Sequence, residues 1–331
     1  MIVYGDPSGG RLDVAEGELE ALLEASGQRA KVSVKEWLVT CNVGELHREV
    51  ATRAAFLQDV GELLLFADAE DILREARSVD FSRLTGRTFK VDAEGFDDSV
   101  KRAVDEAVGD RVLREADGSS VKMKDPDAVI RVVKRGRRAF IGLTTSKGAG
   151  KWVARRPRAR AFFHPSALFP KLARLMVNLT AVAEEGTFLD PFSGTCSTVI
   201  EACLVGSYGL GLDLDKRMVF GGRRNLRGFS LDSASQVLRG DARFLPFREV
   251  DAIAGDLPYG RASSTKGART EDLLEALLAQ SRECLRRGGR LVAMHQKSVP
   301  LEGPKGFEVL GEYDFYAHRS LTRVISVLRR S

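Results

Sequence analysis

Hydrophobic residues recur at two different spacings in the first part of the chain. Apolar positions three to four residues apart predict helices within 12–23 and 47–58. Alternation of apolar and polar residues predicts a strand at 31–35, and a continuous apolar run predicts another at 62–67. The two helices and the strand at 31–35 predict a small α+β unit over residues 1–60, and the strand at 62–67 lies just beyond it.

The pattern changes to strand, helix and paired strands between residues 61 and 145. Residues 86–91 predict a strand, 98–108 a helix, and 128–133 with 138–143 a hairpin. Basic residues gather in this segment. A run of charges is usually a solvated face, but together with a base-binding site it is better interpreted as a surface for phosphates. The predicted phosphate contacts are Lys122, Lys124, Lys134, Arg135, Arg137 and Arg138.

Residues 146–165 lack apolar periodicity and are rich in arginine, which predicts a connector between domains. Arg155 and Arg156 have two interpretations that the residues alone leave open. They line the path of a bound RNA backbone, or they keep the connector soluble. We take the RNA contact as the prediction.

Strands and helices alternate in the remaining residues, 166–331, as in a parallel sheet with helical crossovers. Acidic residues follow three successive predicted strands: Asp190, Asp213 and Asp241. Open α/β sheets bind ligands at the carboxyl ends of their strands. Three acids placed in this way favour a ligand site over isolated surface carboxylates.

The turn after the first of these strands, which opens at Asp190, has the features of a nucleoside-binding site. Gly194 lets the backbone approach a ligand, and Asp213 is placed to accept hydrogen bonds from ribose hydroxyls. The Asp-Pro-Phe opening at Asp190 replaces the Gly-x-Gly-x-x-Gly of dinucleotide sites and is typical of S-adenosylmethionine sites. Asp241 is placed to meet the adenine amine. The predicted cofactor residues are Asp190, Phe192, Gly194, Thr195, Asp213, Asp241 and Asp256.

The segment Asp256-Leu257-Pro258-Tyr259 follows the apolar strand at 250–254. A carboxylate, a backbone carbonyl and an aromatic face in succession can hold a flat, amine-bearing ring by its edge and its face. Asp256 and the Leu257 carbonyl are the expected acceptors for the amine, Asp256 is the expected proton acceptor, and Tyr259 is expected to stack on the ring. The predicted catalytic residues are Asp256, Leu257, Pro258 and Tyr259.

The composition favours a globular protein without a membrane span, a disulfide framework or a metal site. The 331 residues carry a net charge of +5, which weakly favours a polyanionic partner. No apolar run has the length of a membrane span, and the N-terminal residues lack the basic region and apolar core of a signal peptide, so we expect a cytoplasmic protein. The four cysteines form no C-x-x-C pair, and no cluster has metal-ligand spacing, so neither disulfides nor a metal are predicted.

Several of these blocks resemble a known family. Residues 117–127 and the hairpin ending at Leu143 resemble the C-terminal half of a THUMP domain, which binds structured RNA. The Phe-His-Pro-Ser block at 163–166, the turn at 190–195 and the segment 256–261 resemble amino-methylating Rossmann-fold methyltransferases. Together with the ending 318–323, they are similar to the archaeal THUMP-domain tRNA (guanine(10)-N2)-methyltransferases.

The resemblance implies an α/β protein. Its C-terminal part, 166–331, would be a Rossmann-fold S-adenosylmethionine-dependent methyltransferase. Its N-terminal α+β region would comprise a ferredoxin-like unit at 1–60 and a THUMP domain at 61–145, with a linker at 146–165. The implied partner is tRNA, with a possible small activating subunit and neither DNA nor membrane. The implied reaction is methylation of the guanine 2-amino group.

Two positions depart from the family pattern. Cys196 stands where glycine is usual, which puts cofactor affinity in doubt, and Leu257 replaces a common proline but still offers its carbonyl. Two alternatives stay open: a methyltransferase for another guanosine, at tRNA position 6 or in ribosomal RNA, and an RNA-binding protein with a degenerate cofactor pocket. The number of methyl groups added, the tRNA set and the oligomeric state are also open.

Overall fold

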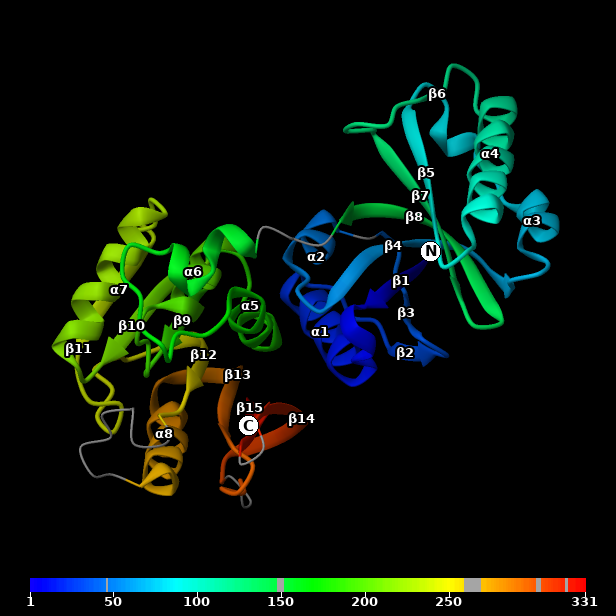
Figure 1. The fold of residues 1–331 in the computed structure, drawn as a ribbon. Coiled ribbons are helices and arrows are strands. Elements are labelled where there is room, and N and C mark those ends of the chain that lie inside the picture. Colours follow the sequence, from blue (N-terminus) through cyan, green and yellow to red (C-terminus); the bar gives the residue numbers. More distant parts are fainter. Residues whose placement is uncertain (46, 148–151, 259–268, 302–304, 319–320) are drawn as a thin grey trace. The chain divides into compact units, whose positions relative to one another are not determined.

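The computed structural model describes residues 1–45, 47–147, 152–258, 269–301, 305–318 and 321–331. The chain forms two compact units (Figure 1). Unit 1 comprises Met1–Ala15, Arg29–Thr52 and Leu57–Gly148, and unit 2 comprises Glu16–Gln28, Arg53–Phe56 and Ala149–Ser331. Within the described residues, no helix combines the length and the apolar character needed to cross a bilayer.

Unit 1 is built on an eight-stranded mixed sheet with the order β2-β3-β1-β4-β8-β7-β5-β6. Helix α4 packs on this sheet because Val104, Val108 and Val112 recur every four residues on its buried face. The elements of this part of the chain are β1 (Ile2–Pro7), α1 (Leu12–Ala25), β2 (Val32–Lys35), β3 (Leu38–Asn42), α2 (Arg48–Arg53), β4 (Leu57–Asp68), α3 (Ile72–Glu75), β5 (Thr88–Glu94), α4 (Asp98–Glu115), β6 (Ser120–Val121), β7 (Ala128–Arg135) and β8 (Arg138–Lys147).

Strand β4 makes this sheet continuous, because it pairs with β1 on one side and with β8 on the other. It begins at Leu57, so the helix predicted over 47–58 is wrong at its end and α2 stops at Arg53. Pairing of Leu57 with Pro7, and of Val60 with Gly5, adds ladder hydrogen bonds that a local helical pattern does not foresee. The domain boundary near residue 60 stays a prediction, and it falls inside β4.

Unit 2 is built on a seven-stranded sheet with the order β11-β10-β9-β12-β13-β15-β14. The strands from β11 to β13 are parallel, and β15 runs antiparallel to both of its neighbours, β13 and β14. The elements are α5 (Pro170–Leu179), β9 (Thr187–Asp190), α6 (Ser197–Leu204), β10 (Tyr208–Asp213), α7 (Lys216–Gly228), β11 (Ser235–Arg239), β12 (Val250–Asp256), α8 (Thr270–Cys284), β13 (Leu285–Gln296), β14 (Phe307–His318) and β15 (Leu321–Arg330).

The chain order reverses between β9 and β12. From β9 the chain moves outward through β10 to β11 and then returns to β12, which pairs with β9 at Phe188 and Leu189. Crevices outside the carboxyl ends of strands form at such reversals, because the crossovers on either side leave in opposite directions. The fold therefore places its natural ligand crevice beside Asp190 and Asp256, the last residues of the two strands.

Two short N-terminal segments belong to unit 2. Glu18 of α1 is fully buried, and its carboxylate accepts hydrogen bonds from the backbone N–H groups of Ala55 (2.9 Å) and Phe56 (2.7 Å). It also accepts from Asn178 Nδ2 of α5 (2.8 Å). A buried carboxylate needs such donors, so the compact unit around the second sheet depends on residues from near the N-terminus as well as on 166–331.

Candidate cofactor and substrate site

A cavity of about 480 Å³ lies at the carboxyl ends of β9, β10, β11 and β12. It brings together the residues predicted to bind a cofactor and most of those predicted to be catalytic. Tyr259 lies outside the described residues, so its place in the site stays a prediction. The predicted residues that line the cavity are Asp190, Phe192, Gly194, Thr195, Asp213, Asp241, Asp256, Leu257 and Pro258.

Asp190 organises the turn between β9 and α6. Its side chain is buried, and it accepts hydrogen bonds from the Phe192 backbone N–H (2.9 Å) and from the Thr198 hydroxyl. Burial raises the pKa of Asp190 to about 7, and the two hydrogen bonds act against this rise. Because both oxygens already have donors from the turn, we interpret Asp190 chiefly as the residue that shapes it.

Asp213 joins this turn to the end of β10. Its Oδ2 accepts from the Gly194 N–H (2.8 Å) and its Oδ1 from the Asp215 N–H (2.8 Å). Gly194 has φ of 48°, a left-handed conformation that glycine adopts at little cost. Burial raises the pKa of Asp213, which these hydrogen bonds oppose. Each carboxylate oxygen can accept a second hydrogen bond, so Asp213 can still bind the hydroxyls of a ligand.

Cys196 occupies a backbone position that favours glycine, with φ of 63° and ψ of 35°. Its side chain is fully buried and is not among the cavity-lining residues of the described chain. The Sγ packs beside Gly222 of α7, where a Cβ would overlap it. The Cys196 side chain therefore packs on the side of the turn that faces away from the cavity, where the absence of a side chain at Gly222 makes room for it.

Side chains that the sequence did not single out as site residues also line the cavity. His164 and Ser166 do so, joined by a hydrogen bond between His164 Nδ1 and Ser166 Oγ (2.7 Å). Arg243 forms an ion pair with Asp241 (2.7 Å) at the cavity edge. The Phe-His-Pro-Ser block carried part of the family resemblance, but a histidine before a proline has no distinctive chemistry in the sequence alone.

Asp256 ends β12 and forms an ion pair with Arg323 of β15. The side chains of both are largely buried, with 16% and 8% of their surface exposed. The next residue, Leu257, is held by a hydrogen bond from its N–H to the Met294 carbonyl of β13 (2.9 Å). Arg323 was not predicted as a site residue. Only the pairing of β15 beside β13 brings it to this edge of the sheet.

The basic residues predicted to contact phosphate differ in their surroundings. Lys122, Lys124 and Arg137 are exposed. Arg135 and Arg138 are half-buried: Arg135 pairs with the buried Asp6 (2.9 Å) and lies over the Trp37 ring.

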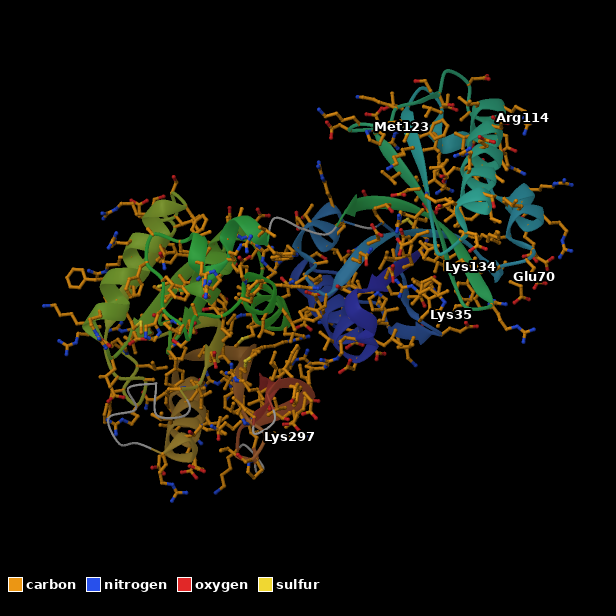
Figure 2. The ribbon with its side chains drawn as sticks, viewed as in Figure 1. Lys35, Glu70, Arg114, Met123, Lys134 and Lys297 are labelled. Carbon is orange, nitrogen blue, oxygen red and sulfur yellow. The ribbon has the colours of Figure 1, made fainter. Side chains whose placement is uncertain are left out.

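Arg138 pairs with Asp68 (3.0 Å) and lies over the Phe66 ring. Lys134 lies 5.7 Å from the centre of the Phe96 ring and, like Lys35, is shown on unit 1 in Figure 2. These cations have structural partners, and their RNA contacts stay predictions.

The two arginines of the predicted connector also differ. Arg155 pairs with Glu201 of α6 (2.8 Å), a fully buried carboxylate that also pairs with Arg174 of α5 (2.7 Å). Arg156 is exposed. A buried carboxylate such as Glu201 needs compensating charges. Arg155 therefore contributes to the stability of unit 2, whether or not it also contacts RNA.

Two family models match the chain. Residues 66–144 match the THUMP domain, and residues 157–303 match the domain described as "RMKL-like, methyltransferase domain". The first match covers the second half of the unit 1 sheet. The second covers most of the cavity and its surrounding strands.

Curated relatives align with most of the chain. The tRNA (guanine(10)-N2)-dimethyltransferase of Methanothermobacter thermautotrophicus is 34% identical over 283 residues, 84% of each chain. The protein of the same name from Pyrococcus abyssi is 30% identical over 96% of each chain. The tRNA (guanine(6)-N2)-methyltransferase of Thermus thermophilus is 31% identical over 71% of this chain and 70% of its own.

Among solved structures, TrmN from Thermus thermophilus superposes with a TM-score of 0.53. The alignment covers 100% of this chain and 99% of that chain, at 23% sequence identity. This similarity supports the Rossmann-like fold of unit 2 and the presence of an N-terminal α+β region before it.

Proposed function

The chain belongs to the family of THUMP-domain methyltransferases that includes the archaeal tRNA (guanine(10)-N2)-dimethyltransferases, and we propose that it methylates the 2-amino group of guanosine 10 in tRNA. S-adenosylmethionine is its cofactor. The observation that supports the proposal most is the convergence of Asp190, Asp213, Asp241 and Asp256 on one cavity at the strand ends. The relatives of that name from Methanothermobacter thermautotrophicus and Pyrococcus abyssi align with 84% and 96% of this chain.

The residues around the cavity fit S-adenosylmethionine. Asp213 has lone pairs that can accept from ribose hydroxyls beside Gly194, whose lack of a side chain lets a ligand approach the backbone. Asp241 lies at the next strand end, where Arg243 pairs with its carboxylate, and its proposed role is to accept from the adenine amine. When bound, this cofactor supplies an electrophilic methyl group on a sulfonium.

Asp256 and the Leu257 carbonyl would hold the target amine. The 2-amino lone pair of guanine is delocalised into the ring, so the nitrogen is a weak nucleophile until its hydrogens are held. The Asp256 carboxylate and the Leu257 carbonyl accept from these hydrogens and align the nitrogen for in-line transfer. Asp256 would take the proton that the nitrogen loses when it accepts the methyl group that the cofactor supplies. Stacking of Tyr259 on the extruded guanine stays part of the proposal.

Unit 1 would bind the body of the tRNA. Its THUMP match and the exposed Lys122 and Lys124 support a role in phosphate contact. Because tRNA is the proposed substrate, we also propose that the reaction takes place in the cytoplasm. A small activating subunit is a further proposed partner, and assays of the purified chain with and without a cell extract would reveal whether one is needed.

The decisive experiment is methylation of tRNA transcripts by the purified chain, followed by mass spectrometry of the nucleosides. We expect N2-methylguanosine and N2,N2-dimethylguanosine in the wild-type transcript. Both should disappear when guanosine 10 is replaced by adenosine and persist when guanosine 6 is replaced. The absence of any methylated guanosine would contradict the proposal.

Guanosine 6 is the second candidate target, because the Thermus thermophilus relative that is 31% identical carries that specificity in its name. The same two transcripts separate the candidates. Loss of product only upon replacement of guanosine 6 would favour this alternative.

A further inference from the structure

Arg323 reaches the candidate catalytic carboxylate from a distant part of the chain. Strand β15 pairs with β13 so that Arg323 lies opposite Gln296, at the edge of the sheet where β12 ends in Asp256. The guanidinium Nη2 of Arg323 meets Oδ1 of Asp256. Because β13 separates β12 from β15 in the sheet, the side chain must extend past one strand to make this contact.

Stability alone does not explain this pair. Burial lowers the pKa of Arg323 to about 10, so the guanidinium is still charged at neutral pH. A buried ion pair contributes little net stability compared with well-packed apolar side chains, because both charges lose their hydration. The same contact has a clear chemical consequence, since Asp256 lines the cavity and the Arg323 guanidinium supplies the opposite charge that compensates this largely buried carboxylate.

We propose that Arg323 is a positioning residue for methyl transfer, which compensates the charge of the Asp256 carboxylate and fixes its orientation in the cavity. Arg323 occupies Oδ1 and thereby leaves Oδ2 to accept a hydrogen from the guanine amine. The pair does not prevent the later proton transfer, because an N-alkylated aromatic ammonium is far more acidic than a carboxyl group. This inference rests on the proposed function of Asp256.

The test compares Arg323→Met, which removes the cation, with Arg323→Lys, which keeps it. Arg329→Met is the matched control, because Arg329 lies on the same strand, is more exposed and pairs with Glu24 instead. Three quantities are measured for each variant: the single-turnover rate of tRNA methylation at saturating tRNA and cofactor, the dissociation constant of S-adenosylhomocysteine by calorimetry, and the melting temperature.

We expect Arg323→Met to lower the single-turnover rate by about 100-fold, the effect of misplacing a catalytic group by about 1 Å. Its affinity for S-adenosylhomocysteine should stay within about threefold of the wild type, because the cofactor contacts proposed for Asp213 and Asp241 are unchanged. Arg323→Lys should recover most of the rate, and Arg329→Met should retain it. In the background of Asp256→Asn, Arg323→Met should cause little further loss, because the residue through which it acts is already neutral.

Three results would overturn the proposal. One is a rate for Arg323→Met within about fivefold of the wild type. Another is a parallel loss of rate, cofactor affinity and melting temperature that lysine fails to rescue, which would indicate a purely structural role. The third is a full additional loss in the Asp256→Asn background. A wild-type protein that methylates no guanosine would instead refute the proposed function, so the two failures are distinguishable.

Discussion

The acidic residues of unit 2 and the basic residues of unit 1 have opposite arrangements. In unit 2, acids that are far apart in the sequence converge on one cavity, because each ends a different parallel strand. In unit 1, basic residues that are close in the sequence are divided among separate partners. Arg131 is buried among Asp59, Asp92 and Glu94, and Arg135 pairs with Asp6.

The difference shows which sequence patterns predict the position of a side chain in the folded protein. A residue directly after a parallel strand must lie at the carboxyl edge, so its place in the fold follows from the strand itself. A residue within a strand alternates between two faces, so neighbours in a basic run are directed to different surroundings. Clusters of charge along the chain are therefore weaker predictors of a binding surface than charges at strand ends.

The largest effect should come from removing the charge of Asp256. We expect Asp256→Asn to lower the single-turnover methylation rate about 1,000-fold, within the range for loss of a proton acceptor. The dissociation constant of the tRNA should change by less than about threefold, because unit 1 is unaltered. Both Asn and Ala remove the carboxylate that pairs with Arg323, but Asn keeps the shape of the side chain and one acceptor oxygen, which Asp256→Ala would remove as well. Near-normal turnover of Asp256→Asn would remove Asp256 from the mechanism.

A smaller effect should follow from Asp213→Asn, which tests the cofactor side of the cavity. Replacement of one acceptor oxygen by an amide should weaken binding of S-adenosylhomocysteine by roughly 10–100-fold, as expected for hydrogen bonds to a charged group. Calorimetry measures the dissociation constant of S-adenosylhomocysteine directly. Asp232→Asn is the control, since Asp232 is an exposed carboxylate outside the cavity lining. Equal affinities for the two variants would argue against ribose binding by Asp213.

The pairing of Cys196 with Gly222 should appear in unfolding free energies. Gly222→Ala places a Cβ against the Cys196 Sγ and should destabilise unit 2 by about 1–3 kcal/mol, the usual range for overpacking. In the Cys196→Gly background the same change should cost less than about 1 kcal/mol. Urea unfolding of the four proteins provides the comparison. An identical cost in both backgrounds would mean that the two residues do not share this space.

The smallest effect should come from the exposed lysines of unit 1. The double variant Lys122→Glu and Lys124→Glu should weaken tRNA binding by roughly tenfold and lower the slope of log affinity against log salt by about 2. Lys134→Glu with Arg135→Glu should weaken binding too. It should also lower the melting temperature, because Arg135 compensates the buried Asp6. Unchanged binding in the first double variant would place the tRNA elsewhere on the protein.

The local sequence was sufficient for much of unit 2. Apolar runs predicted β9, β10 and β12, and the acids that follow them lie where the strand ends predicted. These features depend on residues adjacent in the chain: a strand pattern, a turn that needs glycine, and a polar residue at the strand end. They also carried the family resemblance, since the same few residues define it.

Contacts between distant residues were decided only by the tertiary structure. The sequence did not predict that Arg323 meets Asp256, because a β15 residue reaches that edge only through antiparallel pairing with β13. Nor did it predict the burial of Glu18 in unit 2, or the fit of Cys196 against Gly222. The reason is physical: a residue's own pattern determines whether it is buried or at a strand end, whereas its partner depends on which strands and helices the whole chain brings beside it.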